Sequence, residues 1–287
     1  PHIVTILTMN FLNTEWIAQA LDLPSKFPSQ PFSQISSDTR DLKTGSLFVA
    51  LKGEKSDGHD HVEMARSAGA IALVHREGFA CPAGMISFPV KDTLEAWRAL
   101  SGAWRREFQI PVAVIAGSAG KTTSKELLAA IFRGRWRNVL HTQASQNGFQ
   151  GVPSTLLRLR PEHEAAVIEV GIDEPGSMIQ HLELVAPDAG LLTSIGPEHL
   201  EKLGDLETVE REEGILFSVL GIRGGLAAVN LDDERITRQA EQISESQKIT
   251  YSLKRPANIR GHLSFGQNDE IWMDVEGLSS YPERFRV

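Results

Sequence analysis

One stretch of the chain combines the residue types that bind nucleotide phosphate. Residues 110–125 read IPVAVIAGSAGKTTSK, an apolar run followed by glycines, a lysine and two threonines. Glycines let the backbone approach phosphate oxygens, and the N-terminus of a following helix supplies N–H groups and partial positive charge. Lys121 would reach the β- and γ-phosphates of ATP, and the Thr122 hydroxyl would bind Mg²⁺. We interpret the stretch as a phosphate-binding loop.

This loop is shorter than the common G-x-x-x-x-G-K-[ST] pattern, whose first glycine would fall at Ile115. The alternative is a plain strand-to-helix turn with an exposed lysine. The apolar strand before the glycines and a buried helical stripe expected after them favour the phosphate loop. The expected stripe is Leu127, Leu128, Ile131 and Phe132. The residues expected to contact nucleotide are Gly117, Ser118, Ala119, Gly120, Lys121, Thr122 and Thr123.

Two other polar residues follow or end apolar runs, and a third lies in a polar loop. Glu169 ends the run AAVIEV, where a carboxylate could hold Mg²⁺ or simply accept a bond from a backbone amide. His199 comes shortly after LLTSI and could bind a second metal or a phosphate oxygen, although a lone histidine is more often structural. Asn147 alone would be interpreted as a turn residue.

Glu213 is unusual because it lies among apolar residues on one face of an expected helix. Its spacing from Leu206, Val209 and Leu216 places these residues on the same side. A buried carboxylate needs a partner such as a metal, a lysine or an arginine. The alternative is a twisted helix on which Glu213 reaches solvent beside the neighbouring glutamates.

The elements that must position these residues alternate between strands and helices. After the phosphate loop we expect strands at 138–142, 165–170, 189–195, 225–230 and 248–252, and helices at 152–158, 177–185, 206–220 and 235–243. This alternation predicts an α/β fold with a doubly wound, mostly parallel sheet. Ligands of such sheets bind beyond the carboxyl ends of the strands. That rule groups residues 117–123, 169–173, 193–199 and 230–233.

The chain is expected to form two domains, at 9–109 and 110–287. The first is a small α/β domain, with strands at 47–51, 70–74 and 85–90 and helices at 13–20, 61–68 and 93–108. The boundary lies where the core strand of the second domain begins. Residues 1–8 are treated as an upstream remnant, because Met9 is a plausible natural start. From residue 256 onward the pattern predicts a β-hairpin.

Composition excludes several classes of protein. The 287 residues carry a net charge of −8, which argues against nucleic acid or an anionic membrane as the main partner. The longest apolar run is about eight residues, too short to cross a bilayer, so no membrane insertion is expected. Cys81 is the only cysteine, so no internal disulfide can form. A reducing, cytoplasmic location fits this cysteine usage.

Five segments resemble, in order, the motifs of the Mur ligases of peptidoglycan synthesis. They are AGSAGKTTSKELL, QNGFQGVPSTLLRL, AAVIEVGIDEPGSM, LLTSIGPEHLEKLGDLE and AAVNLDDE. In the first domain, SSDTRDLKTGSLFVALKGEKSDGHDHVEMARSAGAIALV resembles the family's UDP-binding domain. The resemblance covers about residues 9–264. It implies a UDP-sugar-binding domain followed by an ATP-binding Mur ligase domain of the P-loop type.

The resemblance also implies roles for single residues. Lys121, Glu169 and His199 match catalytic positions of the family, and Thr122, Glu169 and His199 match its metal-binding positions. Asn147 matches the first asparagine of an Asn-Asn pair. Residues that match contacts to adenine and ribose are Asn230 and Asp233, and those that match the stretch for uridine are Ser37 and Arg40.

The reaction implied is ATP- and Mg²⁺-dependent amide formation. The carboxylate of a UDP-N-acetylmuramoyl-peptide attacks the γ-phosphate of ATP, and D-alanyl-D-alanine then displaces phosphate from the acyl phosphate. Lys121 and two Mg²⁺ ions would neutralise charge on the transferring phosphoryl group.

Four positions depart from the family pattern. Glu213 stands where the family has a lysine, which several members carbamylate to bind the second metal; we expect Glu213 to share that Mg²⁺ with His199. Because the glutamate is shorter by roughly 3–4 Å, a water bridge would be needed. Gly148 and Asp173 replace asparagines, and Ser194 replaces the asparagine of Asn-Ile-Gly.

The chain also ends before the family's third domain, so little ligase turnover is expected from it alone. The alternative function is a degenerate relative that binds nucleotide or UDP-sugar as a regulator or scaffold. An NTPase unrelated to ligation is disfavoured, because it would leave the UDP-binding domain unexplained.

Overall fold

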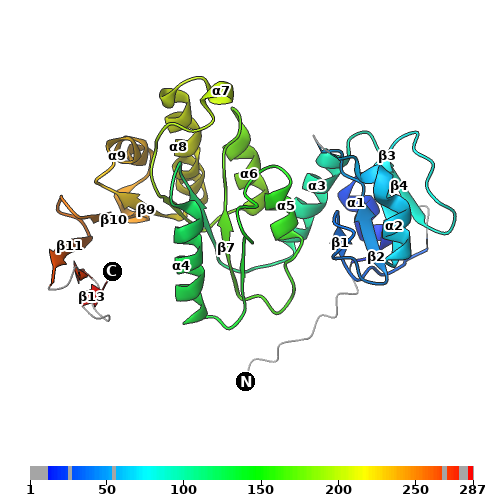
Figure 1. Ribbon diagram of the computed structural model, residues 1–287, viewed down its shortest axis with the longest axis horizontal. Helices are drawn as coiled ribbons and strands as arrows, with labels where there is room; N and C mark the ends of the chain where they lie inside the picture. Colours follow the sequence, from blue (N-terminus) through cyan, green and yellow to red (C-terminus); the bar gives the residue numbers. More distant parts are fainter. Residues whose placement is uncertain (1–11, 25–27, 54–55, 267–269, 278–283, 287) are drawn as a thin grey trace. The chain divides into compact units, whose positions relative to one another are not determined.

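The computed structural model describes residues 12–24, 28–53, 56–266, 270–277 and 284–286. The expected domain start at Met9 lies outside these residues. The chain divides into two compact units (Figure 1). The first runs to Ile110 and also includes Phe149–Glu164, and the second contains Pro111–Gly148 and the chain from Ala165.

The first unit contains a parallel sheet with strand order β1-β2-β3-β4. Its side chains are buried along β2 and through most of β3. Asn13 and Asp92 cap α1 and α3 by accepting hydrogen bonds from first-turn N–H groups. The elements are α1 (Thr14–Ala20), β1 (Ile35–Ser36), β2 (Ser46–Val49), η1 (Gly58–His61), α2 (Val62–Ser67), β3 (Ala70–Arg76), β4 (Ile86–Val90), α3 (Thr93–Arg106) and α5 (Gly151–Leu156).

The second unit confirms the doubly wound, mostly parallel sheet. Its strand order in the described residues is β13-β12-β11-β10-β9-β8-β5-β7-β6. The elements are β5 (Val112–Ala116), α4 (Lys121–Arg133), β6 (Val139–His141), β7 (Ala165–Glu169), α6 (Ser177–Val185), β8 (Ala189–Leu192), α7 (Leu200–Leu203), α8 (Leu206–Arg223), β9 (Leu226–Asn230), α9 (Glu234–Gln239), η2 (Ala240–Gln242), η3 (Glu245–Gln247), β10 (Lys248–Ser252), β11 (Ile259–Phe265), β12 (Ile271–Glu276) and β13 (Arg284–Arg286). The sequence pattern did not predict the short helix α7.

Helices and strands pack as this order requires. Figure 1 shows α4, α6 and α8 beside the central strands, where α4 packs on β7 and α8 packs on β8 and α6. The strands from β6 to β11 run parallel, and β11–β12 and β12–β13 are antiparallel. The hairpin expected after residue 256 is therefore confirmed.

The segment Phe149–Glu164 packs with the first unit, although the sequence placed it in the second domain. Two buried tryptophans of α3 explain the difference. Trp97 Nε1 donates to the carbonyl of Gln150 at 3.2 Å, and Trp104 Nε1 donates to the carbonyl of Leu159 at 3.1 Å. The single domain boundary expected at residue 110 therefore does not account for the later segment that packs with the first unit.

The buried face expected on α4 is wrong in part. Leu127 and Ile131 are exposed, whereas Lys125 and Ala129 are buried. The inward face of α4 thus begins at a lysine. A prediction based on apolar residues alone places the buried face of the helix at 127 and 131, because it assumes that every lysine is exposed to solvent.

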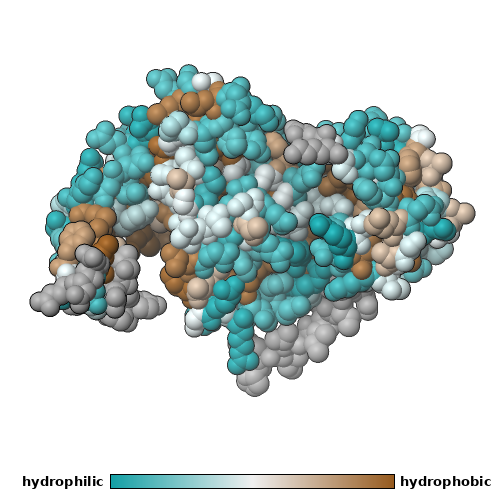
Figure 2. Space-filling model, viewed as in Figure 1, coloured by the Kyte–Doolittle hydropathy of each residue, from teal (hydrophilic) through white to brown (hydrophobic). Residues whose placement is uncertain are grey.

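Apolar side chains also lie on the surface near the end of the chain. Leu253, Leu263 and Phe265 are exposed on and beside β10 and β11, where Figure 2 shows hydrophobic atoms. Across the residues that the structure describes, no helix has both the length and the apolar character needed to cross a membrane.

Candidate nucleotide site

The phosphate loop joins the fully buried strand β5 to α4, as predicted. Gly117 has a φ of +114°, and a Cβ there would lie 2.5 Å from Thr193 Oγ1 and 2.8 Å from the carbonyl of Ser194. Gly120, with φ of +81°, caps α4 in the left-handed region. At Gly117, only glycine combines a positive φ with so close an approach to the loop after β8.

The loop after β8 is bonded directly to the phosphate loop. Ser118 N donates to Ser194 O at 2.8 Å, and Ala119 N donates to Ser194 Oγ at 3.1 Å. Ser118 Oγ and Gly196 also exchange hydrogen bonds. Ser194, a departure from the family pattern, therefore occupies two N–H groups of the loop. The first-turn N–H groups of α4 have no partner within the helix and are the ones that suit phosphate.

Lys121 lies at the phosphate loop, and its side chain is hydrogen-bonded to the backbone of the same loop. Its Nζ donates to Gly117 O at 2.5 Å and lies 3.3 Å from Glu198 Oε2. Both side chains are largely buried. The ammonium is thus held beside the position expected for phosphate, by a carbonyl and a carboxylate. Glu198 was not singled out from the sequence, because a glutamate in a loop gives no pattern.

Three predicted residues meet at the carboxylate that ends β7. Glu169 is buried, and its Oε1 accepts from Asn147 Nδ2 at 2.8 Å and from Thr122 Oγ1 at 3.2 Å. Glu169 therefore binds side chains rather than the backbone amide of the alternative interpretation. Its Oε2 is buried without a hydrogen bond.

Lys125 is a site residue that the sequence analysis missed. Its side chain is fully buried, and its Nζ donates to Ala144 O at 2.8 Å. The same ammonium lies 2.9 Å from Glu126 Oε1 and 3.7 Å from Glu169 Oε2. Lys125 thereby joins α4 to the end of β7 and to the loop that carries Asn147. Its position one helical turn after Lys121 was the available signal.

Glu213 faces inward, so the solvent-exposed alternative is wrong. The side chain is fully buried, and neither carboxylate oxygen has a hydrogen-bond partner. Burial raises the pKa of the Glu213 carboxyl well above its usual value, and the negative charge of Glu198 raises it further. The positive charge of Lys121 opposes both effects. Lys121 is thus a nearby cation of the kind that the sequence analysis required.

His199 lies beside a different carboxylate, that of Asp173. It caps α7 with a left-handed φ of +47°, its side chain is 47% exposed, and its Nε2 lies 3.9 Å from Asp173 Oδ1. Within the described ranges, no three His, Cys, Asp or Glu side chains gather to hold a metal. The donors instead form two groups, Thr122 with Glu169 and Glu198 with Glu213. Buried carboxylate oxygens without partners are the donors that Mg²⁺ prefers, so both groups fit the ion.

Comparison with known proteins matches both units to one family. The model of the Mur ligase middle domain matches residues 115–276, and that of the Mur ligase family, catalytic domain, matches residues 31–105. The chain belongs to the Mur ligase family. The middle-domain match includes the phosphate loop from Ile115 onward and the carboxylates described above.

Individual Mur ligases resemble the chain in sequence and fold. UDP-N-acetylmuramoyl-tripeptide–D-alanyl-D-alanine ligase of Escherichia coli is 41% identical over 69% of this chain and 43% of its own length. A MurF structure from Acinetobacter baumannii matches with a TM-score of 0.78 at 25% identity, covering 96% of this chain and 60% of that one. MurF from Thermotoga maritima, in complex with ADP, shares the fold, with a TM-score of 0.74 at 21% identity over 88% and 57%. The chain spans about half the length of the curated relatives it matches.

Two departures from the Mur ligase pattern lie next to one another. A Cβ at Gly148 would lie 3.0 Å from Asp173 Oδ2, so the position is tight for any larger residue. Asn147, beside it, packs against Gly171, where a Cβ would lie 3.1 Å from the Asn147 side chain. The loop thus keeps the first asparagine of the family pair close to Glu169 while giving up the second.

Asn230 and Asp233 lie at the carboxyl end of β9, as the Mur ligase pattern implies. Asn230 Oδ1 accepts from Asp232 N at 3.0 Å. Asp233 caps α9 through Oδ1, and its Oδ2 accepts from Ile195 N at 3.1 Å. Asp233 therefore already connects α9 to the loop that touches the phosphate loop.

In the first unit, Arg40 is exposed, and its Nη2 lies 2.6 Å from Asp38 Oδ2. This ion pair holds the pKa of Asp38 below its usual value.

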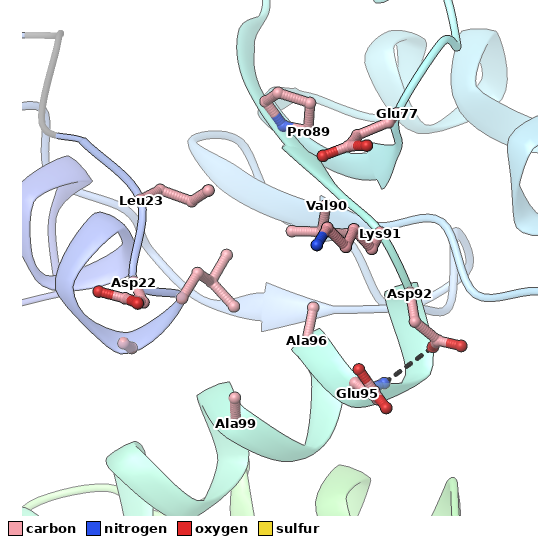
Figure 3. Close-up of a pocket in the computed structure, with 12 residues that line it drawn as sticks. Asp22, Leu23, Glu77, Pro89, Val90, Lys91, Asp92, Glu95, Ala96 and Ala99 are labelled. Atoms are coloured by element: carbon pink, nitrogen blue, oxygen red, sulfur yellow. Dashed lines mark hydrogen bonds between the residues drawn. The ribbon is translucent and has the colours of Figure 1, made fainter.

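A hollow of about 480 Å³ lies elsewhere in this unit (Figure 3). Its charged lining residues are Asp22, Glu77, Lys91, Asp92 and Glu95. Neither Ser37 nor Arg40 lines the hollow, so it is not the expected uridine site.

Proposed function

We propose that the protein is an ATP-dependent ligase that adds D-alanyl-D-alanine to a UDP-N-acetylmuramoyl-tripeptide. The observation that carries the proposal is the meeting of the Thr122 hydroxyl, Asn147 and the buried Glu169 carboxylate beside the phosphate loop. The name of the E. coli relative supplies the two substrates.

The residues of the chain would act mainly by positioning and electrostatics. The first-turn N–H groups of α4 bind phosphate oxygens, and Lys121 turns from Gly117 O toward the β- and γ-phosphates. Thr122 and Glu169 would hold Mg²⁺, which would neutralise charge on the transferring phosphoryl group. The substrate carboxylate attacks the γ-phosphate, ADP leaves, and the amine of D-alanyl-D-alanine displaces phosphate from the acyl phosphate.

The remaining site residues are proposed by position. Asn230 and Asp233 border the adenine and ribose, and Ser37 and Arg40 contact the uridine part of the second substrate. His199 binds a metal or a phosphate oxygen once Asp173 releases it. We place the reaction in the cytoplasm, where ATP is available and Cys81 stays reduced.

A second candidate is a relative that binds nucleotide without turnover. Ser194 favours it, because its side chain occupies the Ala119 N–H group of the phosphate loop. Glu213 also favours it, since the family has a lysine there.

The test is release of phosphate by the protein in the full length that its gene encodes. We expect release only when ATP, UDP-N-acetylmuramoyl-tripeptide and D-alanyl-D-alanine are all present, and none with L-alanyl-L-alanine as the amine. Phosphate release that ignores the amine would contradict the ligase. Tight nucleotide binding with no release under any combination would establish the second candidate.

A further inference from the structure

Lys125, buried one helical turn after Lys121 on α4, lies behind the carboxylate of Glu169. Its Nζ is 3.7 Å from Glu169 Oε2 and donates to Ala144 O at 2.8 Å. A third partner, Glu126 Oε1 at 2.9 Å, belongs to a side chain that is half exposed. Inside the protein the ammonium therefore contacts two structures, the end of β7 and the loop of residues 142–148.

The two carboxylate oxygens of Glu169 have different surroundings. Oε1 accepts hydrogen bonds from Asn147 Nδ2 and Thr122 Oγ1, whereas Oε2 has no hydrogen bond and lies on the side of the Lys125 ammonium. Because a buried cation attracts Oε2, Oε1 stays beside the Thr122 hydroxyl. Residues that orient a metal-binding side chain from behind typically change metal affinity by roughly 10- to 100-fold.

The turn that begins at Ala144 is held by the same ammonium. Ala144 has a φ of +47°, an uncommon conformation for a residue other than glycine. Its carbonyl accepts the hydrogen bond from Lys125. The residues just after it supply Ser145 Oγ, 3.2 Å from Thr122 Oγ1, and the Asn147 amide that binds Glu169. One ammonium thus fixes both the carboxylate and the turn that carries the partners of the carboxylate.

We propose that Lys125 is a positioning residue for metal-dependent nucleotide binding, because it turns Glu169 Oε1 toward Thr122 and holds the turn that carries Asn147. Lys125 acts through Glu169 and does not itself contact nucleotide. The inference rests on the proposed function for the role of Glu169 in holding Mg²⁺. An ammonium also repels a nearby metal ion, and we expect the gain in orientation to exceed this repulsion.

The first experiment is calorimetric titration with a nonhydrolysable ATP analogue, once with Mg²⁺ and once with EDTA. We expect Lys125→Met to raise Kd at least tenfold with Mg²⁺ and to leave the metal-free Kd within twofold of the wild type. Lys202→Met, at an exposed position on α7, is the matched control and should change neither value. A merely structural role would raise both Kd values together.

Two outcomes of this titration would overturn the proposal. One is a Lys125→Met protein whose Kd with Mg²⁺ equals or falls below that of the wild type. The other is an equal rise with and without Mg²⁺. Lys125→Gln, whose amide can still donate a hydrogen bond but carries no charge, is subject to the same test if Lys125→Met folds poorly.

The second experiment needs neither metal nor nucleotide. Gly171 is buried, and its N–H donates to Asn147 O at 2.9 Å, so its hydrogen exchange reports on the turn. The neighbouring Val170 N–H donates to Ile115 O at 2.9 Å within the sheet and is the internal control. We expect Lys125→Met to speed exchange at Gly171 at least tenfold relative to Val170. An unchanged ratio would show that Lys125 does not hold the turn.

The two experiments separate the inference from the proposed function. If the wild type does not bind the analogue, the nucleotide site is wrong, while exchange at Gly171 still decides whether Lys125 holds the turn. If the wild type binds the analogue more tightly with Mg²⁺ and Lys125→Met keeps the same preference, the nucleotide site stands and the positioning role is wrong.

Discussion

The carboxyl group of Glu213 lies where water cannot reach it, against Glu198 and the cation of Lys121. Glu169 is also buried, and its Oε2 has no hydrogen bond but lies 3.7 Å from Lys125 Nζ. Carboxylates in such surroundings lose hydration, so each needs a cation or a proton. At the scale of single residues, the buried carboxylates of the site outnumber the lysines that lie beside them.

Glu213 gives a pH-dependent prediction. Because burial raises its folded pKa, the protonated carboxyl stabilises the fold below pH 4.5, and this contribution is lost as pH rises toward the folded pKa. Glu213→Gln avoids the loss, so its melting temperature without nucleotide or metal should exceed that of the wild type by more at pH 8 than at pH 5. Each kcal/mol corresponds to about 2–4 °C. A difference independent of pH, measured by calorimetry, would contradict this account.

Lys125 gives a second prediction at this scale. Lys125→Met keeps the buried stem but leaves Ala144 O and Glu169 Oε2 without their cation. We expect a loss of about 3 kcal/mol in unfolding free energy, because buried acceptors without partners are costly. Lys202→Met on α7, an exposed position, should stay within about 0.5 kcal/mol. Equal denaturation curves for the two variants would remove Lys125 from the site.

The residues predictable from sequence were those with fixed spacing. Lys121 and Thr122 follow glycines after a strand, and Glu169 ends a buried strand, so topology alone brings them together. Lys125, Glu198 and the bonds of Ser194 were missed. Their roles come from packing between segments that are distant in the sequence, and such contacts leave no periodic pattern in a single sequence.

At the scale of elements, the turn from β5 into α4 requires two glycines for different reasons. A Cβ at Gly117 would meet Thr193 and the backbone of Ser194, whereas at Gly120 the nearest atom is Thr193 Cβ at 4.0 Å. Both have positive φ, but only Gly117 is also crowded.

The pair therefore provides a matched test. Gly120→Ala should cost roughly 1–2 kcal/mol from left-handed strain alone. Gly117→Ala should cost clearly more and should disturb the loop after β8, since the clash involves backbone. Urea denaturation measures both, and a Gly117→Ala variant as stable as Gly120→Ala would show that this close approach is absent.

The order of strands and helices was predictable, because apolar runs of strand length alternate with amphipathic segments. Two features were not. The inward face of α4 begins at Lys125, a residue that hydropathy assigns to water. The segment Phe149–Glu164 packs with the first unit because Trp97 and Trp104 donate hydrogen bonds to its backbone carbonyls. The local sequence pattern does not predict these distant contacts.

At the scale of the whole molecule, each unit matches its own Mur ligase model, and the chain spans about half the length of its curated relatives. In the proposed function, the second unit would bind the nucleotide phosphate and the first would bind the uridine part. The nucleotide half of this proposal depends on one assignment, the phosphate loop at residues 117–123.

Calorimetric titration of the protein with an ATP analogue tests that assignment most directly. Lys121→Ala removes a charge-assisted contact worth about 1.5–3 kcal/mol, so we expect Kd to rise roughly 10- to 150-fold. Lys202→Ala removes the same charge from an exposed position on α7 and should leave Kd nearly unchanged. Equal affinity in the wild type and Lys121→Ala would contradict the central claim.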